Sequence, residues 1–375
     1  MPDMGYQEFL LPKWNAKSEY DVYIITSDRY TPFENYEDTW GKILGKRVCG
    51  IGEMHYKGVN IVRLPVLLEL KSRPYIRGLT ETINKLEPDL LFIHGTGSFS
   101  IYQCAFYFRN SSFKKFADNH MIVDIMQKGW IQSIYYFLHK FFMKKFLSKS
   151  IDLFFGVTKD SCDYLEIYEG APKEKLRLLS LGVDTEIFYP VEKYKNTQSY
   201  PLIIQSGKLN HDKKPQWTAK AVLKLLEKGK NLNLKFIGNG STKIIESIKK
   251  DFHKKGFADR LEIVDLMPLN KLALEFNKAD LVVFPDGTSL SSVEAAACNT
   301  EVLMADLPAS IEREDNGIGK TYPRGDIDSL ASTINSLIED KKVLHQMGKV
   351  SGENARQLYS YESISKNMLA FAKLD

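Results

Sequence analysis

The chain has 375 residues, of which 43% are hydrophobic, 12% aromatic and 26% charged, and its formal net charge is +4. This composition excludes collagen-like, coiled-coil and disordered chains, and at roughly 150 residues per domain the length fits two domains or one large one. No apolar run reaches the roughly 20 residues that span a bilayer, no signal peptide follows Met1, and the cysteines are too scattered for a zinc or disulfide framework. We expect a cytoplasmic protein, and the mild charge calls for no nucleic acid partner.

Strand-like apolar runs alternate with amphipathic helical stretches along the chain, which predicts an α/β fold with mostly parallel sheets. The predicted strands are 21–27, 59–64, 89–94, about 115–119, 153–158, 202–206, 234–238, 261–264, 280–284 and 302–305. The predicted helices are 215–228, 243–255, 270–277, 292–298, 326–340, 342–359 and 363–373.

The best boundary between domains is the polar stretch that separates Pro190 from Pro201. It predicts a doubly wound N-terminal domain over 1–190, a second over 191–360 and a C-terminal helix over 361–375 that packs back on the first. Ligands bind at strand carboxyl ends of such sheets, so we expect a cleft between the domains.

The start of the chain lacks a strand that a doubly wound domain normally has. Gly5 and the residues after it are typical of a turn that opens a helix, with no strand before it. We expect that the first strand is missing and that the natural chain begins upstream of Met1. Alternatively, another segment fills the centre of the sheet.

The strongest chemical motif is PDGTSLSSVEAAA (285–297), a glycine turn between a buried strand and an alanine-rich helix. Free backbone N–H groups in such a turn favour a diphosphate. The motif places Glu294 near a ribose diol and Asp286 near the group beyond the diphosphate. The expected phosphate-binding residues are Gly287, Thr288, Ser289 and Leu290. The alternative is a helix that Asp286 or Ser292 merely caps.

Two further glycine turns follow predicted strands. In SGKLNHDKKP (206–215), Gly207 opens a turn from which Lys208 and Lys213 could bind two anionic phosphates. The alternative is a solvated basic loop. In FIGNGS (236–241), the candidate donor-binding residues are Gly238, Asn239 and Gly240, although any such turn needs small residues.

Together these motifs resemble the group 1 retaining glycosyltransferases (glycosyltransferase family 4), which have the GT-B fold of two Rossmann-like domains. The resemblance also includes GVTKDSCDYL (156–165) and LLSLGVDTEIFYP (178–190). The family's paired glutamates correspond to Asp286 and Glu294. Its arginine–lysine pair on the phosphates corresponds to Lys208 and Lys213, so two point charges replace a bidentate fork.

The resemblance implies transfer of a hexosyl or N-acetylhexosaminyl group from a nucleotide-diphosphate sugar to a glycan or lipid-linked acceptor. The expected context is surface polysaccharide biosynthesis, such as lipopolysaccharide or capsule. Neither a metal nor a cofactor is implied, and Lys208, Lys213 and Asp286 count among the catalytic residues. The alternatives are a GT-B sugar-nucleotide epimerase and a degenerate homologue that only binds nucleotide sugar.

Two histidines, His94 and His120, follow predicted strands of the first half. The family places a histidine at the second position, so we expect His120 to be catalytic, with Asp118 or Asp124 orienting it. The alternative is a histidine that only bonds a backbone carbonyl. Gly5 would leave room for the donor phosphate or the acceptor.

The segment 130–149 mixes seven aromatic residues with four lysines. This pattern predicts peripheral contact with a membrane, at the inner face of the cell membrane. The alternative is a helix that packs on the sheet of its own domain.

Overall fold

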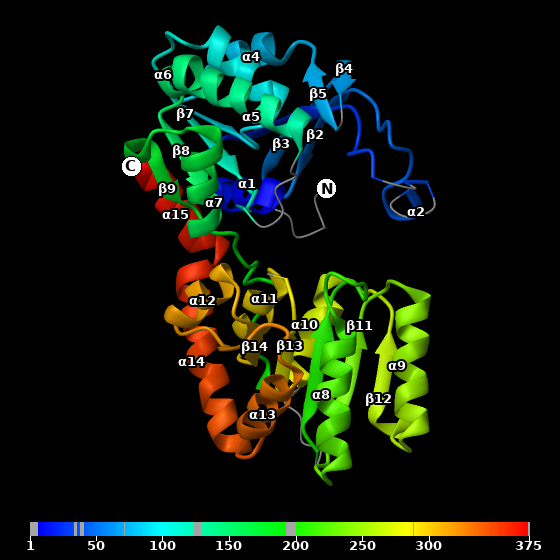
Figure 1. Ribbon diagram of the computed structural model, residues 1–375. Helices are drawn as coiled ribbons and strands as arrows, with labels where there is room; N and C mark the ends of the chain where they lie inside the picture. Colours follow the sequence, from blue (N-terminus) through cyan, green and yellow to red (C-terminus); the bar gives the residue numbers. More distant parts are fainter. Residues whose placement is uncertain are drawn as a thin grey trace. The chain divides into compact units, whose positions relative to one another are not determined.

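The computed structural model describes residues 7–33, 36–37, 41–70, 72–123, 129–192, 200–287 and 289–373. It divides into two compact units (Figure 1): unit 1 is Met1–Ser180 with Ile364–Asp375, and unit 2 is Leu181–Ser363. Unit 2 therefore begins before the polar stretch at 191–200. The reason is that Val183 and Phe188 are buried in its core, and the Val183 N–H donates to the Tyr359 carbonyl at 2.7 Å.

Unit 2 contains one parallel sheet in the order β12-β11-β10-β13-β14-β15. Its strands are β10 (Leu202–Ser206), β11 (Asn233–Ile237), β12 (Leu261–Val264), β13 (Leu281–Phe284), β14 (Glu301–Ala305) and β15 (Lys320–Tyr322). The first five match predicted strands, so those predictions are confirmed. The three-residue β15 was not predicted, because its short, polar sequence gives no apolar run.

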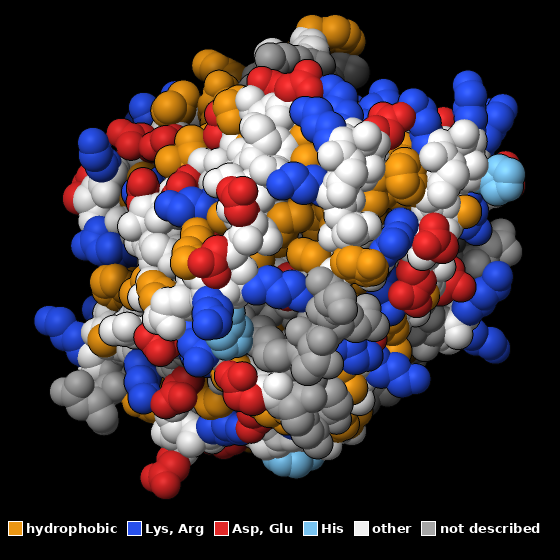
Figure 2. Space-filling view, turned by 90° about the horizontal axis from the view of Figure 1, so that it is seen from below, with side chains coloured by type: hydrophobic (Ala, Val, Ile, Leu, Met, Phe, Trp, Pro, Cys, Tyr) orange, Lys and Arg blue, Asp and Glu red, His pale blue; other side chains and the backbone are white. Residues whose placement is uncertain are grey.

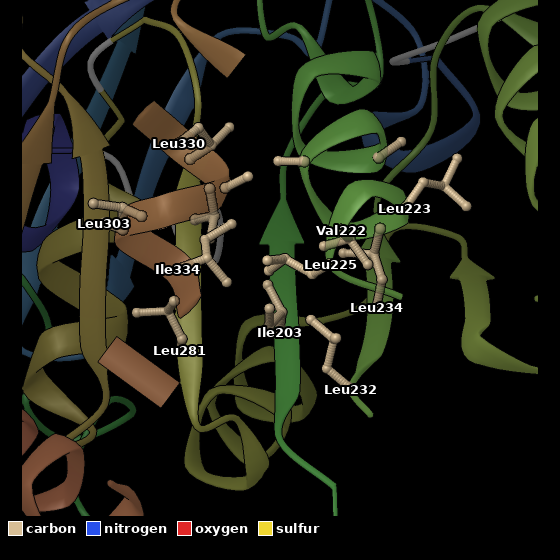
Figure 3. Packing of buried hydrophobic residues seen from close by; sticks show 14 of the residues in the cluster. Ile203, Val222, Leu223, Leu225, Leu232, Leu234, Leu281, Leu303, Leu330 and Ile334 are labelled. Atoms are coloured by element: carbon tan, nitrogen blue, oxygen red, sulfur yellow. The ribbon is translucent and has the colours of Figure 1, made fainter. Parts of the chain in front are cut away.

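Helices cover both faces of this sheet, as in doubly wound domains. They are α8 (Pro215–Glu227), α9 (Thr242–Lys254), α10 (Leu269–Lys278), α11 (Ser291–Ala297), α12 (Pro308–Asp315), α13 (Ile327–Ile338) and α14 (Lys341–Tyr359), with a short 3-10 helix η6 (Ala258–Arg260). On one face, side chains of α8 and α13 pack on the strands, as Ile203, Val222 and Ile334 show in Figure 3. On the other face, α10, α11 and α14 pack around Val282.

Unit 1 divides its strands among three sheets. β1 (Val22–Ser27) pairs in parallel with β3 (Val59–Leu64), which pairs antiparallel with β2 (Gly52–Tyr56). β4 (Val66–Leu70) and β5 (Arg73–Ile76) form a hairpin, and a parallel sheet comprises β6 (Leu90–Ile93), β7 (Lys114–Asn119), β8 (Leu153–Gly156) and β9 (Leu176–Leu178). Within the described ranges no strand joins β1 to β6. The Gly5 turn lies outside them.

The helices of unit 1 include two π-helical segments, η2 (Met143–Leu147) and η3 (Leu165–Glu169). The others are α1 (Gln7–Lys17), α2 (Gly41–Leu44), α3 (Leu79–Leu86), α4 (Phe99–Tyr107), α5 (Trp130–Phe142), α6 (Ser148–Ser150), α7 (Lys159–Tyr164), the 3-10 helix η4 (Lys173–Lys175) and α15 (Tyr361–Ala372). Most of α15 belongs to unit 1, where the Ser365 hydroxyl donates to Asn15 Oδ1 at 2.6 Å.

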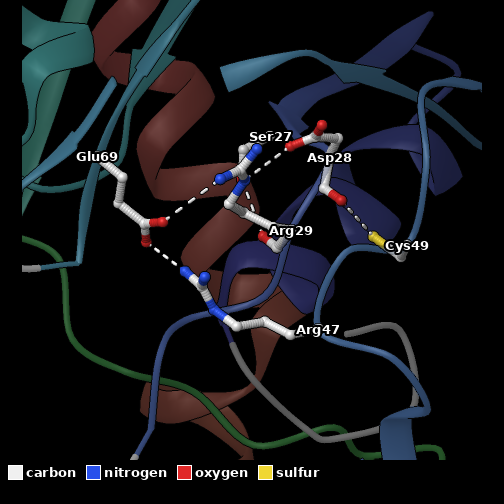
Figure 4. A network of polar contacts seen from close by, with 6 residues as sticks. All are labelled: Ser27, Asp28, Arg29, Arg47, Cys49 and Glu69. Carbon is white, nitrogen blue, oxygen red and sulfur yellow. Dashed lines mark hydrogen bonds and ion pairs between the residues drawn. The ribbon is translucent and has the colours of Figure 1, made fainter. Parts of the chain in front are cut away.

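An ionic network fixes the loop that follows β1 (Figure 4). Arg29 Nε donates to Asp28 Oδ1 at 2.9 Å, and Glu69 of β4 pairs with both Arg29 and Arg47. The Cys49 N–H donates to the Asp28 carbonyl at 2.8 Å. Three chain segments are thereby held together at the carboxyl end of β1.

The surface seen in Figure 2 intersperses basic and acidic side chains, as expected for a solvated face. Among the helices of the described residues, none combines the length and the apolar character needed to cross a bilayer.

Candidate functional site

Two glycine turns of unit 2 pack backbone to backbone. A Cβ on Gly238 would lie 1.9 Å from the Gly207 carbonyl oxygen, and one on Gly240 would lie 2.2 Å from that of Leu209. The Leu209 N–H donates to the Asn239 carbonyl at 2.8 Å, while the Asn239 side chain is exposed. Close packing therefore requires Gly238 and Gly240 whether or not a ligand binds.

Lys213 lies against the turn that follows β13. Gly287 has φ +70°, and a Cβ there would lie 2.9 Å from Lys213 Nζ. Burial lowers the pKa of Lys213. The negative charges of Asp286 and Asp212 oppose that effect, and the positive charge of Lys208 adds to it. Lys208 itself is exposed. The structure thus joins two predicted motifs and places positive charge where both strands end.

Asp286 is almost fully buried and already has partners. Its Oδ1 accepts hydrogen bonds from the Gly287 N–H and from Arg324 Nε, both at 2.8 Å. The Ser292 hydroxyl donates to the Ser289 carbonyl at 3.0 Å, and neither Asp286 nor Ser292 accepts a hydrogen bond from a backbone N–H of α11. The alternative in which Asp286 or Ser292 caps this helix is therefore wrong. Arg324 was missed because it lies 38 positions away with no local signature.

Glu294 occupies the first turns of α11, as predicted, and only 8% of it is exposed. Burial raises its pKa to about 7, although a hydrogen bond with Ser291 opposes the shift. Near neutral pH this carboxyl group exchanges a proton readily, and a ribose diol that donates to it would favour the ionised form. Ser289 and Leu290 precede the helix, whereas Thr288 lies outside the described residues.

Arg313 of α12 was also missed by sequence reasoning. Its Nη1 donates to the Ser289 carbonyl and to the Ser292 hydroxyl, both at 2.7 Å, and burial lowers its pKa. Arg356 of α14 makes matching contacts at the other end of α11, donating to the Ala297 carbonyl at 2.6 Å and to Asn299 Oδ1 at 2.8 Å. The buried guanidinium group of Arg313 and the partly buried one of Arg356 therefore hold this helix at its two ends.

In unit 1, one buried carboxylate joins the two predicted histidines. Asp118 Oδ2 lies 2.9 Å from His94 Nδ1 and 3.2 Å from His120 Nε2, and its Oδ1 accepts from the Gly95 N–H at 2.8 Å. His94 Nε2 reaches Glu8 of α1 at 3.1 Å. Asp118 is thus placed to orient His120, whereas Asp124 lies outside the described residues.

The charges of this cluster reinforce one another. Burial acts to lower the pKa of His94, but the carboxylates of Asp118 and Glu8 outweigh it and raise that pKa to about 10. Burial likewise acts to raise the pKa of Asp118, but the two histidines hold it well below its usual range. His94, Asp118 and His120 are the one group of described residues whose ligand atoms lie close enough together to hold a metal ion. Ion pairing already accounts for their geometry.

Comparison with known proteins shows that the second half of the chain is similar to a known family. Residues 191–356 match the model of the family "Glycosyl transferases group 1". The D-inositol 3-phosphate glycosyltransferase of Corynebacterium glutamicum (strain R) is 25% identical over 215 residues, 52% of this chain and 50% of that protein. The chain thus spans about half the length of such curated relatives. The resemblance read from the sequence is confirmed, because residues 191–356 match the model of that family.

Solved structures identify the fold. A glycosyltransferase from Rickettsia africae superposes with a TM-score of 0.71 at 13% identity, covering 98% of this chain and 93% of that one. Anabaena Alr3699/HepE, solved with UDP and glucose, gives 0.65 at 14% identity, covering 93% and 99%. The expected α/β fold of two Rossmann-like domains, GT-B, is confirmed.

Proposed function

Because residues 191–356 match the model of the group 1 glycosyltransferases, we propose that this protein transfers a hexosyl or N-acetylhexosaminyl group from a nucleotide-diphosphate sugar, with retention of configuration. The observation that carries the proposal is the close approach of Lys213 to Gly287 at the carboxyl end of the unit 2 sheet. The loop that contains Gly287 leads into α11, which carries the buried Glu294. A basic group on a glycine turn suits a diphosphate, and a buried carboxyl group suits a ribose diol.

In this proposal, the bond between the sugar C1 and the diphosphate oxygen breaks, and the electron pair stays on the leaving phosphate. The ammonium groups of Lys213 and Lys208 stabilise that negative charge, together with the backbone N–H groups of Ser289 and Leu290. The acceptor hydroxyl attacks C1 from the same face and gives its proton to the leaving phosphate. The acceptor oxygen forms the new bond to C1, and its proton joins the phosphate oxygen that left C1, so atoms and charge balance.

The sugar end of the site contains the Asp286–Arg324 pair. Since Arg324 occupies Oδ1 of Asp286, the carboxylate keeps its other oxygen for a sugar hydroxyl, while Arg324 itself can donate. The shorter aspartate at this position therefore acts together with an arginine. This pair is where we expect donor-sugar selectivity to arise.

The acceptor side of the proposal is a glycan or lipid-linked acceptor in surface polysaccharide biosynthesis at the inner face of the cell membrane. Membrane contact would come from 130–149, where Trp130 is 75% and Phe137 is 72% exposed. The same segment also packs inwards through Met143 and Leu147, as the alternative of a helix packed on its own domain expects, so the proposed membrane contact concerns its exposed face alone.

A thermal-shift screen against nucleotide sugars, followed by product analysis, tests this function. At 100 times its dissociation constant, the correct donor should stabilise the protein by about 2.7 kcal/mol. Transfer to an acceptor with retention is the expected result. A new sugar nucleotide formed without acceptor would instead indicate the epimerase, for which the His94–Asp118–His120 cluster offers acid and base groups. Binding without turnover would indicate a degenerate homologue, and a screen without any stabilisation would refute the proposal.

A further inference from the structure

An apolar groove of about 740 Å³ runs along α4 in unit 1. Seven of its lining side chains are aromatic and partly or largely exposed: Tyr75, Phe99, Tyr102, Phe106, Tyr107, Phe142 and Phe146. They come from β5, α4, the end of α5 and η2, and Figure 1 shows α4 beside α5 and α6 at one end of unit 1. The volume falls within the roughly 300–1,000 Å³ of small-molecule sites.

Of the uncharged polar side chains that line the groove, Thr80, Gln103 and Tyr102 already have hydrogen-bond partners, and Asn110 is exposed. The Gln103 amide donates to the Ile76 carbonyl at 2.9 Å and accepts from the Ile76 N–H at 3.4 Å, so it is bound to β5. The Tyr102 hydroxyl lies 2.5 Å from the Nδ1 of the buried His139. What remains for a ligand is apolar surface, which suits a hydrocarbon chain better than a sugar.

The rim of the groove is basic. Arg109, Lys145 and Lys149 are exposed, no acidic residue lines the groove, and none of the three forms an ion pair with another described residue. A cleft lined by one sign of charge attracts the opposite sign. The ligand that complements an apolar groove with a basic rim has a hydrocarbon chain and an anionic head.

The same segment exposes a continuous apolar face. Trp130, Ile134, Phe137 and Phe141 follow helical spacing along α5 and are at least half exposed. Such a face next to exposed lysines is typical of helices that lie in the interface of an anionic membrane. A lipid held in the groove would therefore come from the bilayer on which this face rests.

We propose that the groove along α4 holds one acyl chain of an anionic lipid, whose phosphate binds Lys145 and Lys149. The inference rests on the membrane contact proposed above and goes beyond it, because it assigns a defined lipid site rather than adsorption. The groove binds a single acyl chain, and the exposed face of α5 contacts the surrounding bilayer.

Vesicle cosedimentation tests the charge complementarity. The native chain should bind vesicles of equal phosphatidylglycerol and phosphatidylcholine and should bind pure phosphatidylcholine far less. Lys145→Glu/Lys149→Glu should weaken binding to the anionic vesicles at least about tenfold. The matched control is Lys228→Glu/Lys230→Glu, an equal charge change beside a polar pocket of unit 2, which should change binding less than about twofold.

A single-chain lipid separates the groove from general adsorption. Monomeric oleoyl lysophosphatidate, below its critical micelle concentration, should bind with one-to-one stoichiometry by calorimetry. Phe106→Ser should weaken this binding about tenfold and Phe137→Ser should not, although both side chains are mostly exposed. If vesicles bind but the monomer does not, or if both variants respond equally, the groove site is wrong and the membrane contact stands. If neither the vesicles nor the lysophosphatidate bind, the groove site and the membrane contact are both wrong. Binding of nucleotide, measured in parallel, reports on the donor site alone.

Discussion

One buried carboxylate of unit 1 and two buried carboxyl groups of unit 2 are held in opposite ways. In unit 1, Asp118 lies between His94 and His120, and its pKa is lowered despite burial. In the described part of unit 2, Glu294 and Glu301 form no ion pair, and burial raises the pKa of each to about 7, although the charge of Lys320 opposes the shift of Glu301. A carboxylate with a cationic partner stays ionised inside the fold. A buried carboxyl group without such a partner keeps its proton until a cation or a hydrogen-bond donor stabilises its charged form. Unit 2 thus keeps a carboxyl group ready for a ligand, while unit 1 uses its carboxylate for internal order.

Because of this difference, the stability of each unit depends on pH in a different way. For Glu294 and Glu301, the folded pKa exceeds the unfolded value, so stability is present at low pH and falls as pH rises from about 4.5 to 7. For His94, the folded pKa is raised, so its contribution is complete below about 6.5 and is lost as pH rises towards 10. The lowered pKa of Asp118 adds stability that is lost only as pH falls below about 4.

The largest effect on stability is expected from Asp118→Asn. The substitution removes the charge that compensates two histidines inside unit 1, and breaking such a buried pair costs about 3–5 kcal/mol. Denaturant unfolding, followed by hydrogen exchange in β7, measures the loss. Asp152→Asn is the control, since Asp152 is more exposed and lies 3.8 Å from Lys114, and it should cost less than about 1 kcal/mol. Equal losses would contradict the special role of Asp118.

The next largest effect is expected on turnover, from Lys213→Ala in unit 2. Loss of one donor aimed at the developing charge reduces kcat by roughly 10²–10³. Lys208→Ala should also reduce turnover, but less, because Lys208 is exposed whereas Lys213 lies against Gly287. Steady-state kinetics with the identified donor, together with thermal melting, separates activity from folding. Full activity of either variant would return that lysine to the role of a solvated loop residue.

The same contrast explains what could be read from the sequence. In unit 2 every predicted strand is confirmed, because strands buried on both faces give unbroken apolar runs. In unit 1, β2, β4, β5 and β9 were missed, since most of their residues are exposed or only partly buried. Asp118 was foreseen beside His120 because both end the same strand. Arg313 and Arg324 were not, since their contacts with Ser289 and Asp286 depend on tertiary packing across 24 and 38 positions.

A third prediction separates the two unpaired carboxyl groups of unit 2. Glu294→Gln and Glu301→Gln should each stabilise the protein at pH 8, by about 2–3 kcal/mol, because each removes a buried charge that forms only above pH 7. Melting curves from pH 5 to 8 should flatten equally in both variants. Nucleotide affinity, measured by calorimetry, should weaken only in Glu294→Gln. Unchanged affinity in that variant would count against ribose binding by Glu294.

The smallest effect is expected from the two arginines that hold α11. Arg313→Met and Arg356→Met each remove charge-assisted hydrogen bonds and also relieve a desolvated charge, so each should cost only about 1–2 kcal/mol of stability.

Their effects on ligand binding should differ. Arg313 fixes Ser289 in the candidate phosphate loop, and its charge lies near enough to Lys213 to lower the pKa of that residue. Arg313→Met should therefore weaken binding of the nucleotide found by the donor screen about tenfold and reduce its salt dependence, and Arg313→Lys should partly restore both. Arg356→Met acts at the far end of the helix and should leave the affinity for that nucleotide unchanged. If both variants weaken nucleotide binding equally, Arg313 serves the packing of α11 and contributes nothing specific to the anion, and the contrast between the two ends of that helix disappears.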